Sequence, residues 1–94
     1  MTRQFSKDKV DANQGEIVKA LKSVGVSVEV IKKPVDLMIC CRGETSLMEV
    51  KNPDGKDTIT KEQADFIARW PGKIHIVRTP MEAVKAAVGE KYVT

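Results

Sequence analysis

Three segments of the chain carry hydrophobic residues at helical spacing, and each starts at a residue that can cap a helix. The predicted helices begin at Asp11 or Asn13, at Thr60 and at Thr79, and they end at Gly25, at Pro71-Gly72 and at Gly89. The inward-facing stripes include Ile17, Ala20, Leu21 and Val24 in the first helix and Ala64, Ile67 and Ala68 in the second. Thr79 precedes Pro80 at the first helical position and Glu82 at the third, which indicates a helix start.

The segments between these helices have the β-branched and apolar residues of strands. Four strands are predicted, at Val26–Ile31, Asp36–Arg42, Thr45–Lys51 and Lys73–Arg78. The middle two form a hairpin whose faces are both largely apolar, so we expect the sheet to be covered on both sides. The fourth strand follows a helical crossover and is expected to run parallel to the third. The sequence therefore predicts an α/β fold with the order α-β-β-β-α-β-α, a small mixed sheet flanked by helices on both faces.

Length and composition fit one small domain. The chain has 94 residues, of which 41% are hydrophobic and 31% are charged, and these proportions are ordinary for a folded globular domain. We expect residues 11–94 to form the domain and residues 1–10 to form a flexible tail. A chain this short buries a modest core, so a partner subunit is expected. The net charge of +3 is only mildly basic, and nucleic-acid binding would therefore depend on a local patch.

The sequence gives no sign of a membrane or secreted protein. Residues 1–10 lack the apolar core and cleavage site of a signal peptide, and no segment approaches the roughly 20 apolar residues that span a bilayer. Cys40 and Cys41 are adjacent, which suits neither a bridging disulfide nor a metal pair, so we expect both to be reduced. The single histidine, His75, is expected to be packed or at a rim. No glycine-rich nucleotide loop is present, no organic cofactor is expected, and a cytoplasmic location is predicted.

Two acids and a lysine come together in the predicted hairpin. A two-residue loop at Gly43-Glu44 sets a register that places Asp36 opposite Lys51, with Glu49 as the diagonal neighbour of Asp36. Glu49 and Lys51 are two positions apart and therefore share a face of the sheet. Two neighbouring carboxylates beside an ammonium suit a hard divalent cation and a phosphodiester substrate.

This spacing resembles the PD-(D/E)xK nuclease superfamily, in which an Asp begins one strand and a Glu-x-Lys lies in the next. The resemblance covers residues 11–89 and rests on five segments in order. These are Asp11-Ala-Asn-Gln-Gly-Glu16, Asp36-Leu-Met-Ile, Met48-Glu-Val-Lys51, Thr60-Lys-Glu-Gln63 and Ile76-Val-Arg78. Within the superfamily, the chain is similar to small stand-alone VRR-NUC and Holliday-junction-resolvase-like nucleases that phages often carry. The resemblance implies a restriction-endonuclease-like core. The chain departs from the pattern at Val35, which separates Pro34 from Asp36.

The resemblance implies a magnesium- or manganese-dependent reaction. Asp36, Glu49 and the backbone carbonyl of Val50 would be ligands of Mg²⁺ or Mn²⁺, and Glu16 would point toward the same ion from the first helix. Lys51 would position or deprotonate the attacking water and stabilise the added negative charge. Hydrolysis would leave a 3′-hydroxyl and a 5′-phosphate without a covalent enzyme intermediate.

Two of these assignments have structural alternatives. Gln63 matches a helix glutamine that approaches the scissile phosphate or the attacking water in such nucleases, which makes it a catalytic candidate. Three residues after Thr60, it is also the capping-box residue of the second helix. Glu16 is equally suited to cap the first helix with Asn13, or to lie at the surface.

Nucleic-acid contacts are expected from six basic residues. The candidates are Lys32, Lys33, Arg42, Lys56, Lys73 and Arg78. Arg78 closes the fourth strand, where the resembling nucleases carry an arginine, and its planar guanidinium suits a phosphate. It would equally cover a helix end, and scattered lysines often serve only solubility. The segment Asn52 to Ile59 is either a flap over the site or a long turn.

These observations lead us to expect a metal-dependent endonuclease that cuts branched or otherwise structured DNA. A homodimer is expected because symmetric paired cuts require two sites. A restriction-type or nicking nuclease on plain duplex DNA is one alternative. A non-catalytic nucleic-acid-binding or assembly module with the same fold is the other. For the expected cytoplasmic location, the resemblance to phage-type nucleases implies a phage-infected or prophage-carrying bacterium as host.

Overall fold

The structure is a computed structural model that describes residues 4–89, with side chains described from residue 13 onward. Its elements are α1 (Gln4–Ser23), β1 (Ser27–Val30), β2 (Leu37–Cys41), β3 (Glu44–Val50), α2 (Lys61–Arg69), β4 (Ile74–Val77) and α3 (Pro80–Val88). The predicted α/β class and order of elements are confirmed. The helices in this part of the chain include none that is long and apolar enough to cross a membrane.

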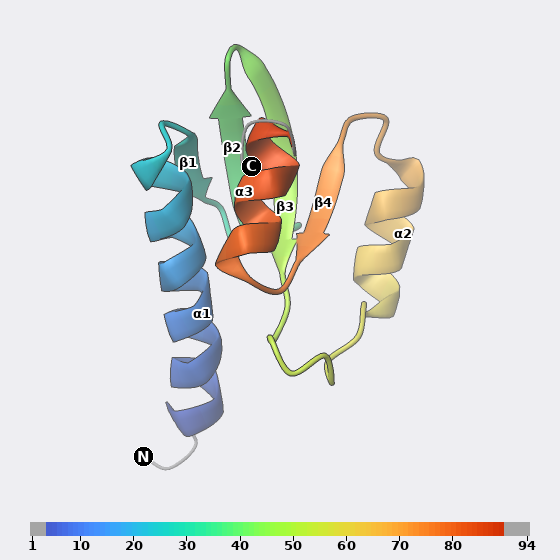
Figure 1. The fold of residues 1–94 in the computed structure, drawn as a ribbon. Coiled ribbons are helices and arrows are strands. Elements are labelled where there is room, and N and C mark those ends of the chain that lie inside the picture. Colours follow the sequence, from blue (N-terminus) through green and yellow to red (C-terminus); the bar gives the residue numbers. More distant parts are fainter. Residues whose placement is uncertain (1–3, 90–94) are drawn as a thin grey trace.

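The four strands form one mixed sheet in the order β1-β2-β3-β4 (Figure 1). β1, β2 and β3 are antiparallel neighbours, and β4 pairs with β3 in parallel. The chain returns from β3 to β4 through α2, so the parallel pairing predicted from the helical crossover is confirmed.

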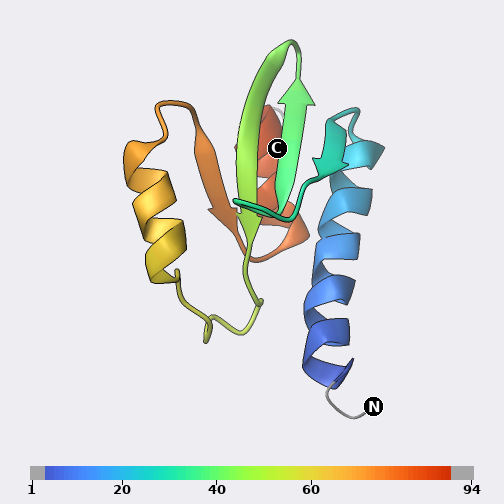
Figure 2. The same ribbon diagram turned by 180° about the vertical axis from the view of Figure 1, so that it is seen from behind.

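Helices lie on both faces of this sheet. α1 and α3 cover one face, where Ile17 and Leu21 pack with Met48, Val50 and Ala83 in the main core. α2 lies toward the other face, where a smaller cluster joins Val35, Leu47 and Phe66. Figures 1 and 2 show α3 crossing the front of the sheet, with α2 flanking β4 on the side away from α1. The two faces therefore differ in the amount of core that they bury.

Helix α1 begins earlier than the sequence patterns predicted. It starts at Gln4 rather than at Asp11 or Asn13, so the expected tail is helical over residues 4–10. Residues 4–14 contain no glycine or proline, and nothing in their sequence stops the helix from extending in this direction. Residues 1–3 and 90–94 lie outside the described part of the chain.

The hairpin register also differs from the prediction. The turn is Arg42-Gly43 with φ of 54° and 83°, and Cys41 pairs with Glu44. Two positive φ values are the signature of a type I′ turn, which is unusual for arginine and therefore hard to expect from sequence. Each β2 residue faces a β3 residue two positions earlier than predicted. This register places Asp36 opposite Glu49 rather than opposite Lys51.

Helix α2 presents a different side to the sheet than expected. Its one buried residue is Phe66, whereas Ala64 and Ala68 are exposed and Ile67 is half-buried. Phe66 carries far more apolar surface than an alanine, so its burial decides how the helix is rotated. Gln63, three residues earlier, lies on the same side of the helix as Phe66 and faces the sheet with it.

The two helix caps predicted by sequence are confirmed. Thr60 caps α2 in a complete capping box with Gln63, and α2 gives way to an extended Trp70 just before Pro71-Gly72. Thr79 caps α3 by accepting a hydrogen bond from the backbone N–H of Glu82, and Gly89 ends that helix.

Replacing two glycines by alanine is expected to have opposite effects on stability. Gly43→Ala should lower the free energy of unfolding by about 1 kcal/mol or more, because alanine is strained at positive φ. Gly15→Ala should raise it by about 0.5–1 kcal/mol, because Gly15 lies within α1 with open space around it. Urea denaturation followed by circular dichroism measures both. Equal effects would contradict the turn assigned to Arg42-Gly43.

Candidate active site

The predicted catalytic residues lie together at the C-terminal end of β3, on the face of the sheet toward α2. Along β3, Leu47 and Glu49 alternate with Met48 and Val50, and Leu47 packs against Phe66 of α2. Lys51 follows directly and keeps the same alternation through its backbone N–H, which donates to the carbonyl of Val77 at 2.9 Å. Glu49 and Lys51 therefore share the α2 side of the sheet.

Asp36 is fixed opposite Glu49 by backbone hydrogen bonds. Its Oδ2 accepts a hydrogen bond of 2.8 Å from the backbone N–H of Val50. The backbone carbonyl of Asp36 accepts from the N–H groups of Ile31 and Lys32 at 2.9 and 3.2 Å. In a strand, the N–H and carbonyl of one residue point to the same side, so the Val50 carbonyl also lies on the Asp36 side of β3.

Glu49, Lys51 and Gln63 form a closed set of polar contacts. The Gln63 Nε2 donates to Glu49 Oε2 at 2.6 Å, and the Lys51 Nζ donates to Gln63 Oε1 at 2.9 Å. The third side is an ion pair of 3.4 Å between Lys51 Nζ and Glu49 Oε2. Glu49 and Lys51 are only 4% and 7% exposed, so the ion pair lies in a region of low dielectric.

Gln63 is the capping-box residue that the sequence offered as one alternative, and its side chain also reaches the two charged residues. Its Oε1 accepts from the backbone N–H of Thr60 at 3.1 Å, and its own N–H donates to Thr60 Oγ1 at 3.1 Å. The same Oε1 also accepts a hydrogen bond from Lys51 Nζ, which is possible since a carbonyl oxygen has two lone pairs. The amide nitrogen remains available for Glu49. One side chain therefore caps α2 and holds both charged residues.

The electrostatics of Glu49 favour a nearby cation. Burial raises its pKa, the negative charge of Asp36 raises it further, and the contacts with Lys51 and Gln63 partly offset these effects. Glu49 Oε1 is buried, and no hydrogen-bond partner for it exists in the described part of the chain. Asp36, Glu49 and the Val50 carbonyl supply hard oxygen atoms of the kind that Mg²⁺ and Mn²⁺ prefer. The donor set fits such an ion.

Glu16 is not brought to this group. It is exposed on α1, and α1 packs on the opposite face of the sheet through Ile17 and Leu21. Among the residues whose side chains are described, no three His, Cys, Asp or Glu residues lie close enough together to hold a metal ion. The cation would therefore depend on two carboxylates, a backbone carbonyl and water.

Asn13, one of the two predicted caps of the first helix, instead joins α1 to the end of the sheet. Its Nδ2 donates to the backbone carbonyls of Lys51 at 3.0 Å and of Arg78 at 3.2 Å. These carbonyls follow β3 and β4 directly. No pattern in the sequence indicates this contact, because it joins segments far apart along the chain. Asn13 thereby helps to fix the backbone that carries Lys51.

Arg78 makes internal contacts rather than facing open solvent. Its Nη1 donates to the Asn52 carbonyl and to Asp57 Oδ1, both at 2.7 Å, and its Nη2 donates to the Asp57 carbonyl at 2.9 Å. Burial acts to raise the pKa of Asp57, but the hydrogen bonds from Asn52 and Arg78 lower it overall. In the described structure, Arg78 therefore joins the two ends of the segment from Asn52 to Asp57 and holds this segment as a turn after β3.

The remaining basic candidates lie in different places. Lys32 and Lys33 are exposed before β2 and line a cavity that reaches Gln63. Lys56 is exposed in the turn after β3, near the end of the sheet that carries the site. Arg42 is in the hairpin turn at the other end of the sheet. Lys73 lies beside His75, whose pKa is lowered by burial and by the charge of Lys73.

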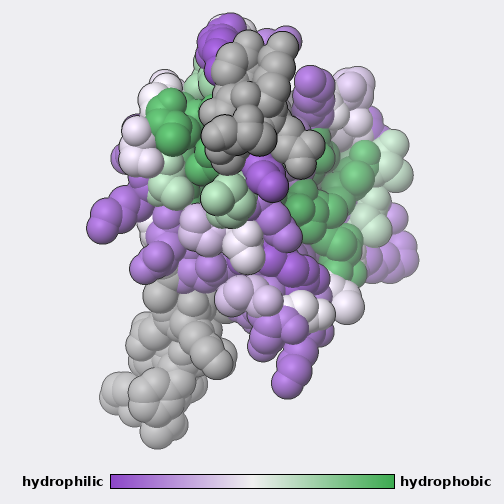
Figure 3. All heavy atoms as spheres, viewed as in Figure 1, coloured by the Kyte–Doolittle hydropathy of each residue, from purple (hydrophilic) through white to green (hydrophobic). Residues whose placement is uncertain are grey.

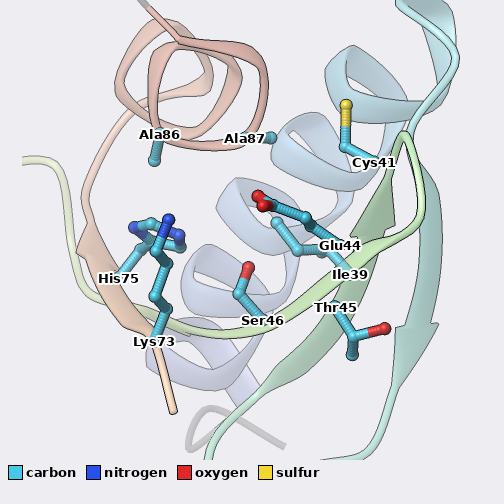
Figure 4. Close-up of a pocket in the computed structure, with 9 residues that line it drawn as sticks. All are labelled: Ile39, Cys41, Glu44, Thr45, Ser46, Lys73, His75, Ala86 and Ala87. Carbon is cyan, nitrogen blue, oxygen red and sulfur yellow. The ribbon is translucent and has the colours of Figure 1, made fainter.

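A separate cavity of about 270 Å³ lies between α3 and the sheet (Figure 4). His75 and Lys73 lie at one of its walls, with Ala86 and Ala87 of α3 nearby, and Cys41 lies at its other end. Cys40 and Cys41 are both free thiols, as expected. The sheet separates this cavity from Asp36 and Glu49, and it plays no part in the candidate site.

Comparisons with known proteins do not identify a family. No family model, no curated protein and no solved structure matches the chain. The geometry of the candidate site is therefore the basis for any functional assignment.

Replacing Asp36 by asparagine is expected to lower the pKa of Glu49. Asparagine keeps an oxygen for the Val50 N–H but removes the charge that raises this pKa. Carbon-detected NMR of the glutamate carboxyl groups measures the change, with the exposed Asp54→Asn as control. When the pKa of an acid is raised in the folded state, the folded protein becomes less stable as the pH rises through that pKa and the acid ionises. In chelator, Asp36→Asn should therefore gain stability relative to wild type as the pH rises through this range. An unchanged Glu49 pKa would contradict the electrostatic effect of Asp36 on Glu49.

Proposed function

We propose that this protein is a metal-dependent nuclease that hydrolyses phosphodiester bonds in branched or otherwise structured DNA. The observation that carries the proposal is the buried carboxylate of Glu49. One of its oxygens has no partner among the described residues, and it lies opposite Asp36 and beside the Lys51 ammonium. Burial and the nearby charge of Asp36 raise the pKa of Glu49, and acids whose pKa is shifted in this way cluster at functional sites.

The metal would be held by this chain's own oxygen atoms. Asp36 and Glu49 would be its carboxylate ligands, and the Val50 carbonyl would be the backbone ligand. When bound, Mg²⁺ or Mn²⁺ would supply a more acidic water and would neutralise charge on the phosphate. The Val50 N–H holds Asp36 in position before any ion binds, so little rearrangement is needed.

Lys51 would act directly on the reacting groups. Its ammonium is held by Gln63 and Glu49, which leaves its position well defined. A positive charge fixed in a region of low dielectric stabilises the negative charge that develops on the phosphate. Lys51 can also orient the attacking water. Gln63 would position both Glu49 and Lys51 rather than take part in proton transfer itself.

A homodimer is part of this proposal, because paired cuts need two sites. β4 is an edge strand, and its Ile76 is exposed. Figure 3 shows a hydrophobic area on the side of the molecule where β4 and α2 lie. An edge strand with an exposed apolar side chain is a common place for strands of two subunits to pair. This edge supports the proposed association.

Removing the charge of Lys51 is expected to abolish cleavage. Lys51→Met keeps most of the side-chain volume and should lower the cleavage rate by about 100-fold or more, the typical cost of losing one group that stabilises the transition state. The cleavage rate is measured on labelled four-way junctions and matched duplexes, in the presence of Mg²⁺, Mn²⁺ or chelator. Lys19→Met, at an exposed position of α1, is the control.

The outcomes of this assay separate the candidate functions. Metal-dependent cutting of junctions in preference to duplexes supports the proposal. Equal cutting of both substrates would favour a duplex nuclease. Binding without any metal-dependent cutting by wild type would favour a non-catalytic module.

Divalent metal is expected to stabilise the wild-type protein but not Asp36→Asn. At a metal concentration about 100 times the dissociation constant, binding adds about 2.7 kcal/mol to the free energy of unfolding. The midpoint of thermal unfolding should rise with Mn²⁺ in wild type, return in chelator, and stay constant in Asp36→Asn. The exposed Asp54→Asn should respond like wild type. The same rise in Asp36→Asn would show that the metal binds elsewhere.

A further inference from the structure

Two adjoining cavities form one groove on the α2 side of the sheet. The first, of about 680 Å³, lies between the segment before β2 and helix α2, and Gln63 is part of its lining. The second, of about 560 Å³, continues along the sheet toward Trp70. Pro34 and Phe66 line both cavities. The groove therefore begins at the candidate active site and leads away from it.

The floor of this groove is apolar and partly exposed. It is formed by Ile31, Pro34, Met38, Leu47, Phe66 and Trp70. Trp70 is 43% exposed and Met38 is 38% exposed, so the groove leaves large apolar side chains open to solvent. The rings of Phe66 and Trp70 stack with centroids 5.3 Å apart. Gly72 leaves room for the indole, because a Cβ atom there would lie 2.8 Å from Trp70 Nε1.

The rim near the active site is basic. Lys32 and Lys33 line it on the sheet side, and Arg69 lines it on α2. The guanidinium of Arg69 lies 5.2 Å from the centre of the Phe66 ring, which places positive charge next to the aromatic floor. Glu62 is the acidic residue in the same lining. An aromatic floor beside a positively charged rim is the arrangement that binds single-stranded nucleic acid.

We propose that this groove binds an unpaired strand of nucleic acid, with bases against Trp70 and the apolar floor and phosphates along Lys32, Lys33 and Arg69. One consequence rests on the proposed nuclease function. Because Gln63 is part of the groove lining, the bound strand would enter the active site at Gln63. Substrates with an unpaired segment next to the cut would then be preferred. A continuous duplex should bind less well. Its base faces are covered by stacking, so its charged phosphates would lie against the apolar floor. A second copy that met this groove across a two-fold axis would bring the basic rims together, which opposes association through the groove itself.

Trp70 is the only tryptophan of the chain, so its fluorescence reports on this groove directly. Oligo(dT) of about 12 nucleotides, within the site sizes of single-strand-binding grooves, should quench the fluorescence of wild type in chelator. Oligo(rU) of the same length distinguishes RNA from DNA as the strand that is bound. A duplex hairpin of equal nucleotide content should quench less. No quenching by either single strand would overturn the proposal.

Two pairs of variants locate the contact. Trp70→Ala should weaken binding of labelled oligonucleotide about tenfold in anisotropy assays, the loss expected for one stacked base, whereas Trp70→Phe should recover much of it. Lys33→Glu should weaken binding and flatten its dependence on salt, because a phosphate contact is lost. Lys19→Glu makes the same charge change on α1 and should have a smaller effect. Equal losses for the two charge reversals would overturn the assigned rim.

The test separates this inference from the nuclease proposal. Binding in chelator requires neither metal nor Lys51. If the oligonucleotides quench the fluorescence of Lys51→Met as they quench that of wild type, while wild type cuts nothing, the groove proposal is supported and the nuclease proposal fails. If wild type cuts DNA while Trp70→Ala binds every oligonucleotide as wild type does, the groove proposal fails alone. A change of oligomeric state in Trp70→Ala, measured by light scattering, together with unchanged binding would assign the groove to a second copy and overturn it.

Discussion

The burial of Glu49 beside Asp36 is the constraint that organises this structure. Two acids at the end of neighbouring strands repel one another, and burial strengthens the repulsion. The fold accepts this because Lys51 and Gln63 hold one carboxylate oxygen and the Val50 N–H holds Asp36. The other Glu49 oxygen has no partner among the described residues. Core packing alone would place an apolar residue at this position, so the arrangement favours a function that uses the charge.

The two faces of the sheet bury cores of different size. The face under α1 and α3 carries the larger core, including Ile17, Leu21 and Met48, all of them fully buried. The face toward α2 carries a small cluster around Phe66 and leaves the rest open as a groove. A domain of this size has little apolar surface to spare. Concentrating the core on one face leaves the other free to hold charged and exposed aromatic side chains.

Local sequence signals predicted the order of helices and strands, but they could not predict contacts between residues far apart in the sequence. Caps at Thr60 and Thr79 and the parallel β4 were predictable because turn and helix signals are local. The hairpin register was wrong by two residues, yet Asp36 and Glu49 still met, because a shift of two keeps every side chain on its face. Asn13 joins α1 to the sheet instead of capping the helix, and Glu16 lies exposed on α1; both outcomes depend on where α1 packs.

Gln63 shows why the site and the fold cannot be separated. Its amide oxygen completes the α2 capping box and accepts from Lys51, while its nitrogen donates to Glu49. α2 is attached to the sheet by this amide and by Phe66, its one buried residue. The bonds that start the helix are therefore the bonds that position the charged pair. Since Gln63 and Phe66 also line the groove, a strand bound there would contact the same two residues that fix α2 over the site. Substrate binding and active-site geometry would then be coupled through one helix.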